Sequence, residues 1–333
     1  MAETNAPVSV VMGAYNAARF IIESLDSIRA QSAAPLEIIV VDDASTDATG
    51  ALAEAWGATV VRQPSRSGVA GSRNAGIARA TGEFIAICDA DDLWHPAKLE
   101  RQCAALGRVP DVDFAFCDYY DFSSDGIINP SLFKAVHTHF ERVERIPLGD
   151  AAYRCTRESL NAVTLHQTFA LPSTFVVRRS LVNDLGGFDV DAPPQEDVEF
   201  LLRVFTRSDG VFIDAPLMGY RRHDNNVSGD PRKLRYGMIK HADRVIAHSE
   251  RYRPESARHF STAYPELLFK AGRMYASYGE ADRARDLLLS SLAKRRSAAT
   301  LLWLGLTPIL RARIARELLQ ALKALVASRP PRK

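Results

Sequence analysis

Cysteine is scarce in this chain, and its spacing matches neither a disulfide framework nor a zinc site. The four cysteines are Cys88, Cys103, Cys117 and Cys155, with no C-x-x-C motif, and most of them stand in apolar stretches. Such a pattern is typical of a protein from a reducing compartment. We therefore expect free thiols and no metal held by cysteine.

Long hydrophobic runs are missing as well. The longest, residues 298–310, is interrupted by Pro308 and is shorter than the roughly 18 residues that a membrane-spanning helix needs. The first residues, MAETNAPVSVVMG, lack a basic region followed by a long apolar core, so we expect no signal peptide. Together these features predict a cytoplasmic protein.

Acidic residues are sparse in the last third of the chain. Residues 226–333 hold 22 Lys and Arg against 9 Asp and Glu, a net charge of +13. Residues 1–225 hold 20 against 31, a net charge of −11. The split predicts a basic module appended to an acidic one. Aromatic residues are not interleaved with the basic ones, so we expect no nucleic-acid partner.

Short apolar stretches alternate with amphipathic ones in the N-terminal part. Strands are predicted at residues 8–12, 38–41, 59–61 and 84–88, and helices at about 17–31, from residue 48 to about 56, and from the glycine-rich segment 65–76 to about 80. Units of roughly 30 residues that alternate in this way predict an open, mainly parallel sheet. Ligands are then expected at the carboxyl ends of the strands.

Aspartates gather at two of these strand ends. Asp42 and Asp43 follow the second strand, whereas Asp89, Asp91 and Asp92 follow the fourth. Carboxylates this close together repel one another unless a cation neutralises them, and oxygen ligands suit a hard ion such as Mg²⁺ or Mn²⁺. The alternative is a solvated acidic turn ahead of the next helix.

Seven short motifs in a fixed order make the chain resemble the family-2 glycosyltransferases. They are VSVVMGAYN, VVDDASTD, SGVAGSRNAG, DADDLWHP, PSTFVVRRSLVNDLGGFD, QEDVEFLLRV and YRRHDNNVS, and together they cover about residues 7–230. The resemblance implies an α/β fold of the GT-A type, with a mainly parallel nucleotide-binding sheet flanked by helices. It implies a glycosyltransferase domain over 1–228, with a nucleotide-sugar half (7–110) and an acceptor half (111–228). After Asn226 the pattern becomes wholly helical, which predicts an all-helical, basic C-terminal region over 229–333.

The resemblance also implies which residues bind the donor nucleotide. They are Tyr15, Asp42, Asp43, Arg66, Gly68, Arg73, Asp89, Ala90 and Arg221. Asp43 is the first choice for the base, because a carboxylate accepts a hydrogen bond from a uracil or guanine N–H. For Asp42 and Asp43 the alternative is an Asx turn that caps the next helix. For the glycine-rich segment, anion binding at a helix N-terminus and plain packing are equally open.

The implied metal ligand is Asp91, with Asp92 and His223 as further ligands. Mg²⁺ or Mn²⁺ held there would neutralise the charge that develops on the leaving nucleoside diphosphate. His223 follows two arginines, so an ordinary basic loop is the alternative reading of that position.

The implied general base is Asp197, supported by Glu196. It would take a proton from an acceptor hydroxyl as that hydroxyl attacks the anomeric carbon, which inverts the configuration in a single step. The helix dipole also favours two carboxylates at a helix start, which is the structural alternative. Val198 stands where the family usually has an aromatic residue, and this leaves the shape of the acceptor pocket open.

These assignments predict an inverting glycosyltransferase of polysaccharide biosynthesis for the cell envelope. It would move a sugar from a UDP-, GDP- or dTDP-sugar to a hydroxyl group of a glycan or lipid-linked acceptor, with residues 123–170 as a lid over the acceptor. Two other classes stay open, a metal-dependent sugar nucleotidyltransferase and a non-catalytic nucleotide-binding scaffold. The motifs name neither the sugar, nor the base, nor the acceptor.

The C-terminal region is predicted to be helical. Residues 267–292 resemble one tetratricopeptide-like helix pair, which is too little to build a solenoid. Residues 294–333 hold 10 Lys and Arg and a single acidic residue, Glu317, with apolar residues at helical spacing. A basic amphipathic helix of this kind lies on an anionic membrane surface or docks on the protein with its basic face in water. The first alternative would place the protein at the cytoplasmic face of the membrane.

Overall fold

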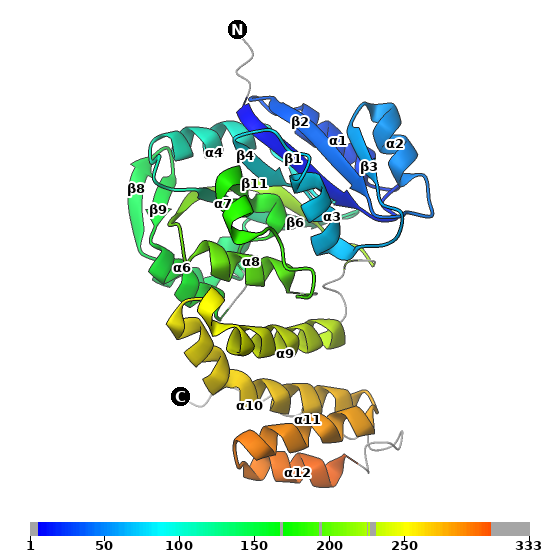
Figure 1. Ribbon diagram of the computed structural model, residues 1–333, viewed down its shortest axis with the longest axis vertical. Coiled ribbons are helices and arrows are strands. Elements are labelled where there is room, and N and C mark those ends of the chain that lie inside the picture. The colour runs from blue at the N-terminus through cyan, green and yellow to red at the C-terminus, as the bar shows by residue number, and fades with distance from the viewer. Residues whose placement is uncertain (1–5, 167–168, 193–194, 225, 227–230, 308–333) are drawn as a thin grey trace. The chain divides into compact units, whose positions relative to one another are not determined.

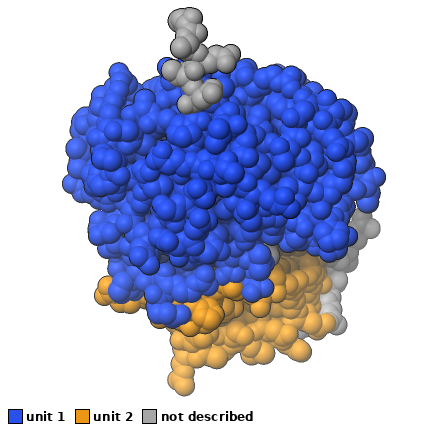
Figure 2. Space-filling view, turned by 45° about the horizontal axis from the view of Figure 1, so that its top comes forward, with its two compact units in different colours: residues 1–226, 250–256 blue, residues 227–249, 257–333 orange. Residues whose placement is uncertain are grey.

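The computed structural model describes residues 6–307 except 167–168, 193–194, 225 and 227–230. The chain forms two compact units, which Figure 2 shows in separate colours: unit 1 comprises residues 1–226 and 250–256, and unit 2 residues 227–249 and 257–333. Across the described residues, no helix has both the length and the hydrophobicity needed to cross a membrane. The domain boundary after residue 228 remains a prediction.

Strand and helix alternate through the first part of unit 1, as the sequence predicts (Figure 1). The elements are β1 (Ala6–Ala14), α1 (Ile21–Arg29), β2 (Pro35–Asp42), α2 (Thr49–Trp56), β3 (Thr59–Arg62), α3 (Gly68–Ile77) and β4 (Phe84–Ile87). The first helix begins later than the expected residue 17. Residues 17–20 form a turn that is tied to the start of α2, because the amides of Ala17 and Ala18 donate to Thr49 Oγ1 (2.8 Å) and Asp47 Oδ2 (3.1 Å).

The second part of unit 1 adds shorter elements around the same sheet. They are β5 (Leu93–Trp94), α4 (Lys98–Gly107), β6 (Phe114–Ser123), β7 (Gly126–Asn129), α5 (Leu132–Ala135), η1 (Thr138–Arg142), β8 (Arg145–Gly149), β9 (Ala152–Cys155), α6 (Arg157–Thr164), η2 (Pro172–Thr174), β10 (Val176–Arg178), α7 (Arg179–Leu185), α8 (Glu196–Val204) and β11 (Gly210–Arg221). The sequence predicts no particular element between residues 123 and 170, where the structure has β7, α5, η1, β8, β9 and α6.

One mixed sheet flanked by helices organises unit 1 (Figure 1). Its strand order is β3-β2-β1-β4-β10-β6-β11-β9-β8, with β5 paired to β11 and β7 to β6. The strands β3, β2, β1 and β4 are parallel, and β10 runs antiparallel between β4 and β6. Since β1 lies between β2 and β4, the carboxyl ends of these three strands meet at one edge, where ligands bind in open α/β sheets. The aspartates predicted to form the site follow β2 and β4.

Helix α3 packs closely on this part of the sheet. A Cβ atom on Gly76 would lie 2.4 Å from Val11 Cγ1 of β1 and 3.2 Å from Val41 Cγ2 of β2, so only glycine permits this approach. Both valines belong to the sheet core, and Val11 is completely buried. The close packing fixes α3 against β1 and β2 and so fixes the direction of its polar side chains.

Aromatic side chains fill the core beside β6 and β11. Phe116 of β6 contacts Phe212 of β11 with ring centroids 5.3 Å apart, and Phe133 stacks on Phe212 at 4.8 Å. Phe140 and Phe169 contact the same group, at 5.8 and 5.3 Å from Phe116. Phe133, Phe140 and Phe169 come from the stretch in which the sequence predicts no particular element, and their apolar burial holds it against the sheet.

A late stretch of the chain, residues 250–256, also belongs to unit 1. The Tyr252 hydroxyl donates to Glu199 Oε1 of α8 at 2.8 Å. Ser256 Oγ donates to Asn161 Oδ1 of α6 at 3.1 Å. Unit 1 is therefore completed by residues that follow a helix of unit 2.

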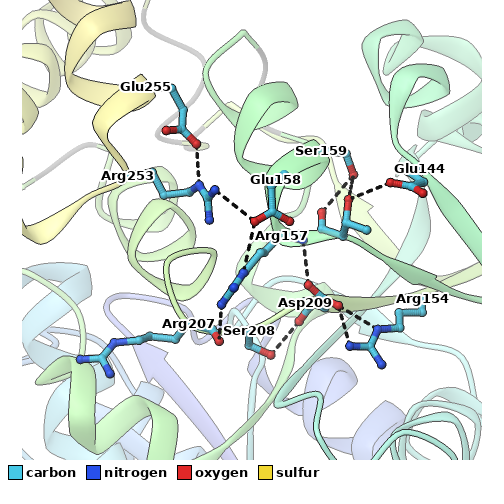
Figure 3. A network of polar contacts seen from close by, with 11 residues as sticks. Glu144, Arg154, Arg157, Glu158, Ser159, Arg207, Ser208, Asp209, Arg253 and Glu255 are labelled. Carbon is cyan, nitrogen blue, oxygen red and sulfur yellow. Dashed lines mark hydrogen bonds and ion pairs between the residues drawn. The ribbon is translucent and has the colours of Figure 1, made fainter.

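An ion pair joins the same stretch to α6, and a neighbouring one joins β9 to the residue before β11 (Figure 3). Arg253 pairs with Glu158 of α6 (3.1 Å) and with Glu255 (2.6 Å). In the same network, Arg154 of β9 pairs with Asp209 at 2.7 Å, immediately before β11. The contacts in Figure 3 thus tie three separate segments of the chain together.

Unit 2 is helical throughout its described residues. Its helices are α9 (Pro231–Ala247), α11 (Ala281–Lys294), α12 (Ala298–Leu306) and α10 (Pro254–Ser277) from residue 257 onward. The short helix η4 (Ser249–Arg251) follows α9, and its last two residues belong to unit 1. Helices α10 and α11 form the predicted helix pair, joined at Gly279, whose φ of +80° suits glycine. A Cβ atom on Gly272 would lie 2.6 Å from Leu288 Cγ, which explains the glycine at this close helix contact. Most of the predicted amphipathic helix lies outside the described residues, from residue 308 onward.

Candidate active site

The loops after β1 and before α3 place an aromatic ring against a guanidinium group at the carboxyl edge of the sheet. The guanidinium carbon of Arg66 lies 3.9 Å from the centroid of the Tyr15 ring. Tyr15 is 38% exposed, so this stacked pair presents a flat surface to solvent. A surface of this kind is able to stack on a nucleotide base, which has a π face of its own.

Asp43 caps α3 in the structure. Its Oδ1 accepts hydrogen bonds from the amide (2.7 Å) and the hydroxyl (2.6 Å) of Ser67, and its Oδ2 accepts from the Gly68 amide at 2.8 Å. Gly68 has a φ of +78°, a conformation that favours glycine at this turn. Since a carboxylate has about four acceptor positions, Asp43 keeps roughly one for a ligand.

Asp42 is engaged by its own turn. Its Oδ1 accepts from the amide of Ser45, three residues further along the chain, at 3.0 Å. A Cβ atom on Gly50 would lie 2.2 Å from Asp42 Oδ2, so α2 also presses on this carboxylate. Both aspartates thus have structural hydrogen bonds, although neither is the expected cap of α2, and their contact with a base stays a prediction.

The acidic turn after β4 meets the end of β11. Asp91 Oδ2 and His223 Nε2 are 2.9 Å apart. Arg221 donates from Nε to the Asp91 carbonyl (2.8 Å) and from its amide to Asp92 Oδ1 (3.3 Å). The Asp92 residue itself is only 1% exposed. Two of the three predicted metal ligands, Asp91 and His223, therefore lie together, although they are 132 positions apart in sequence.

Charge repulsion is strong in this turn. Burial and the neighbouring Asp89 raise the pKa of Asp91, while His223 opposes the shift. Burial, Asp91 and Asp89 raise the pKa of Asp92 well above its ordinary value. A divalent cation would relieve this repulsion and favour the ionised carboxylates.

The residues present fit a partly formed cation site. Among the described residues, no three or more His, Cys, Asp or Glu side chains gather closely enough to form a complete metal site. Asp91 and His223 offer an oxygen and a nitrogen ligand, and Mg²⁺ commonly completes its coordination with water and substrate phosphates. The donor set is thus compatible with Mg²⁺ or Mn²⁺ once a phosphate-bearing substrate takes part.

Two further predicted donor-binding residues, Ala90 and Asp89, are held in place by hydrogen bonds of their own backbone groups. Ala90 is 6% exposed, and its carbonyl accepts from Ser24 Oγ at 2.9 Å, so that oxygen is already engaged. The Asp89 amide donates to Ser173 Oγ at 2.9 Å, which leaves the Asp89 carboxylate for other contacts. These bonds keep the turn in place on the sheet.

Arg73 joins the two halves of the site. The residue is 3% exposed, and its Nη2 contacts Asp89 Oδ1 at 2.8 Å while its Nη1 contacts Glu196 Oε1 at 3.0 Å. Although burial alone would lower the pKa of the guanidinium, the charges of Asp89 and Glu196 raise it above its ordinary value. Asp197 follows Glu196 at the start of α8, so the proposed base lies next to a carboxylate that touches the same guanidinium as the donor-side Asp89.

Asp197 has the protonation behaviour expected of a general base near neutral pH. Burial raises its pKa to about 7, and the neighbouring Glu196 contributes in the same direction. The Val198 amide, which donates to Asp197 Oδ1 at 2.8 Å, and the Arg73 charge oppose this rise. A carboxyl whose pKa lies near the working pH is well suited to take up a proton.

Several contacts that shape the site could not be found from the sequence. The side chain of Asn74 accepts from the Phe188 amide (2.8 Å) and donates to the Phe188 carbonyl (2.7 Å), which holds the turn after α7. Glu23 pairs with Arg221 at 2.7 Å. The second arginine of that segment, Arg222, pairs instead with Asp121. These partners are about 100 to 200 positions apart, so no local pattern marks them.

Comparison with known proteins places the chain among glycosyltransferases. A family model described as Glycosyl transferase family 2 matches residues 9–186, more than half of the chain. The chain is 41% identical over 107 residues to the putative glycosyltransferase EpsE of Bacillus subtilis strain 168, a match over 30% of this chain and 38% of EpsE. It is 27% identical over 233 residues to the glycosyltransferase GlyG of Streptococcus pneumoniae serotype 4, over 66% of this chain and 72% of GlyG.

A further relative is the amylovoran biosynthesis glycosyltransferase AmsB of Erwinia amylovora, 38% identical over 109 residues, which cover 30% of this chain and 36% of AmsB. The matched segments thus span well under half of EpsE and AmsB. Among solved structures, S. aureus TarS 1–349 in complex with UDP-GlcNAc has a TM-score of 0.61 at 17% identity, over 95% of this chain and 91% of that one. The mannosyltransferase PcManGT of Pyrobaculum calidifontis, in complex with GDP-Man and Mn²⁺, has a TM-score of 0.55 at 20% identity, over 98% and 88%. These structural likenesses show a shared fold.

Proposed function

Because the chain belongs to glycosyl transferase family 2, we propose that it transfers a sugar from a nucleotide-sugar donor to a hydroxyl group of a glycan or lipid-linked acceptor. The observation that carries the proposal is the contact of Arg73 with both Asp89 and Glu196. A transferase needs its donor and its acceptor base within reach of each other. The shared guanidinium supports such an arrangement, since it links the acidic turn to the start of α8.

The donor would bind along the carboxyl edge of the sheet. UDP-GlcNAc bound to TarS and GDP-Man bound to PcManGT support a nucleotide-sugar as the donor class. The nucleotide's aromatic base would stack on the pair formed by Tyr15 and Arg66. The acceptor position that Asp43 has left would take a hydrogen bond from an N–H group of that nucleotide base. Arg221 would meet the phosphates, because its guanidinium lies at the acidic turn and suits phosphate geometry.

Mg²⁺ or Mn²⁺ would be held by Asp91 and His223, with Asp92 beneath them. When bound, the ion would offset the negative charge that grows on the leaving nucleoside diphosphate. The Mn²⁺ in the PcManGT complex supports a divalent metal in this fold. Arg221 holds the turn that carries these ligands through its bonds to Asp91 and Asp92.

Asp197 would act as the general base. Its carboxylate takes the proton of the acceptor hydroxyl as the hydroxyl oxygen attacks the anomeric carbon and the bond to the nucleoside diphosphate breaks. A single displacement of this kind inverts the configuration. The pKa of about 7 supports the role, because the residue is then able to accept a proton at neutral pH.

The acceptor would belong to surface polysaccharide synthesis, as the name of the relative AmsB suggests. We also propose that the protein contacts a membrane peripherally through its C-terminal region. Leu289, Leu301 and Leu302 are 49%, 57% and 63% exposed. The exposed basic run of residues 294–296 lies between the helices that carry them. Apolar side chains beside basic ones suit an anionic lipid surface.

The test of the donor proposal is calorimetric titration of UDP, GDP, dTDP and CDP into the protein with Mg²⁺, with Mn²⁺ and with EDTA. We expect one of these diphosphates to bind, and to bind more weakly once EDTA removes the metal. Binding of none of them under any condition would contradict the proposal.

The test of the base is Asp197→Asn. We expect turnover with the matching nucleotide-sugar to fall by at least about 100-fold, since general bases contribute about 10²- to 10⁴-fold, while diphosphate binding is retained. Turnover equal to that of the unmodified protein would remove Asp197 from this role.

A further inference from the structure

Arg73 is the only charged group described in contact with both the acidic turn and the start of α8. We propose that Arg73 is a positioning residue, which holds Glu196 and so Asp197 at a fixed place beside Asp89. The inference rests on the proposed function and extends it from the groups that react to the group that aligns them.

The position of the guanidinium is fixed by the packing of its helix. Gly76, one turn further along α3, allows the helix to lie directly on Val11 of β1. Asn74, the residue directly after Arg73, makes two hydrogen bonds to the Phe188 backbone. Arg73 therefore projects from a helix that is tied both to the sheet and to the segment leading into α8.

Both arms of the guanidinium are already used. One contacts Asp89 at 2.8 Å and the other contacts Glu196 at 3.0 Å, and the Arg73 side chain is 4% exposed. To turn toward a donor phosphate, Arg73 would have to give up one of these two ion pairs, and loss of the one with Glu196, whose side chain is 12% exposed, is unfavourable. The contacts therefore favour a structural bridge. The resemblance instead implies that Arg73 contacts the donor nucleotide.

The start of α8 depends on this bridge. Gln195, at the N-cap position, makes no capping hydrogen bond with its side chain. Further along the helix, Glu199 is fully buried, pairs with Arg203 at 2.6 Å and accepts from Tyr252 at 2.8 Å. The second turn of α8 is thus held by Arg203 and Tyr252, and the first turn is held by Arg73 through Glu196.

The bridge also controls the charge around Asp197. Glu196, on the same helix as Asp197, raises the pKa of Asp197, and Arg73 on α3 opposes this effect. Asp89, in the turn after β4, acts on the site through its contact with Arg73. If the charge of Arg73 is removed, the repulsion from Glu196 is no longer balanced. The pKa of Asp197 then rises further, and less of the residue is ionised at neutral pH.

The experiment compares Arg73→Met, Arg73→Lys and the matched control Asn74→Ala, which loosens the same helix without changing its charge. We expect Arg73→Met to move the acidic limb of the kcat/KM profile upward by about one pH unit, the lower end of the shift caused by a neighbouring charge. Its kcat at neutral pH should fall while the KM for the donor changes by less than about threefold. Arg73→Lys and Asn74→Ala should leave the limb where it is in the unmodified protein.

A large rise in donor KM with an unmoved acidic limb would overturn the inference and make Arg73 a donor contact. If Arg73→Met does not fold, the double variant Arg73→Met/Glu196→Gln removes both charges of the pair, and we expect its limb to lie within about half a unit of the unmodified one. A limb shifted upward in that variant would contradict the bridge.

A second readout separates this inference from the proposed function. The Asp197 carboxyl carbon, observed by ¹³C NMR in aspartate-labelled protein, reports its titration without any turnover. If the unmodified protein transfers no sugar, the proposed function fails, yet an upward shift of this titration in Arg73→Met still supports the bridge. An unshifted titration contradicts it, whatever the activity.

Discussion

The helix cap formed by Asp43 offers a quantitative test of how a predicted base-binding residue also stabilises the fold. Asp43 is 3% exposed and accepts three hydrogen bonds from Ser67 and Gly68. Loss of an N-cap costs about 0.5–2 kcal/mol, and a buried N–H left without a partner costs about 1–3 kcal/mol. Because these effects overlap, we expect Asp43→Ala to destabilise the start of α3 by about 2–4 kcal/mol.

Asp43→Asn should cost less, at about 1 kcal/mol, because one side-chain oxygen still accepts from Ser67. The assay is hydrogen exchange of peptides that cover residues 68–77. A local loss of 2–4 kcal/mol corresponds to exchange that is about 30- to 1,000-fold faster in Asp43→Ala. The control is Glu54→Ala, which removes a surface ion pair with Arg62 and should change stability by less than about 0.5 kcal/mol.

Exchange in α3 at the rate of the unmodified protein would refute the capping argument. Calorimetry on the same variants separates the two roles of the carboxylate. If Asp43 also meets the base, Asp43→Asn should weaken diphosphate binding by about 1–3 kcal/mol while its fold remains nearly intact, as expected when a buried donor loses its acceptor. Unchanged binding would leave Asp43 with the structural role alone.

Three further predictions follow from the metal site, the packing of α3 and the C-terminal region. Asp91→Ala should abolish the metal dependence of diphosphate binding; equal affinity of the unmodified protein with Mg²⁺ and with EDTA would contradict the assignment. Gly76→Ala should lower the free energy of unfolding by about 1–3 kcal/mol, because its Cβ would lie 2.4 Å from Val11. The control Gly107→Ala, whose Cβ would meet no neighbouring atom within 4 Å, should not destabilise unit 1. Equal urea midpoints for the two variants would refute the packing argument. Deletion of residues 297–333, or the pair Leu301→Glu and Leu302→Glu, should reduce sedimentation with anionic vesicles but leave neutral vesicles unaffected; undiminished sedimentation of both variants would end the membrane proposal.

The elements that the sequence predicted well are those whose hydrophobic pattern is local. The parallel strands β1, β2 and β4 are buried on both faces, so they read as short apolar runs. By contrast, β8 has the sequence RIPLG with mostly exposed side chains, and its position is set by pairing with β9. An exposed edge strand has no alternation to detect. The stretch from 123 to 170 was therefore unreadable for a physical reason.

The candidate site divides in the same way. Carboxylates at strand ends can be recognised in the sequence, because Asp89 and Asp91 follow closely on an apolar run. The residues that hold them in place cannot be recognised in this way. Arg73 contacts Glu196, which lies 123 positions further along the chain. Nothing in the glycine-rich segment indicates which carboxylate Arg73 contacts. Pairings of this range depend on the packing of helices on the sheet, and only the three-dimensional structure supplies them.

The course of the chain limits how these proteins exchange parts by recombination. Residues 250–256 return to unit 1 after α9. A gene fused after codon 226 would therefore encode α8 without Tyr252, whose hydroxyl donates a hydrogen bond to Glu199. Glu199 is fully buried and would keep Arg203 but lose this bond. A junction beyond Ser256 would keep this bond but would interrupt α10 and separate α9 from the remainder of unit 2. Because the two units alternate along the chain, no single junction exchanges one of them whole.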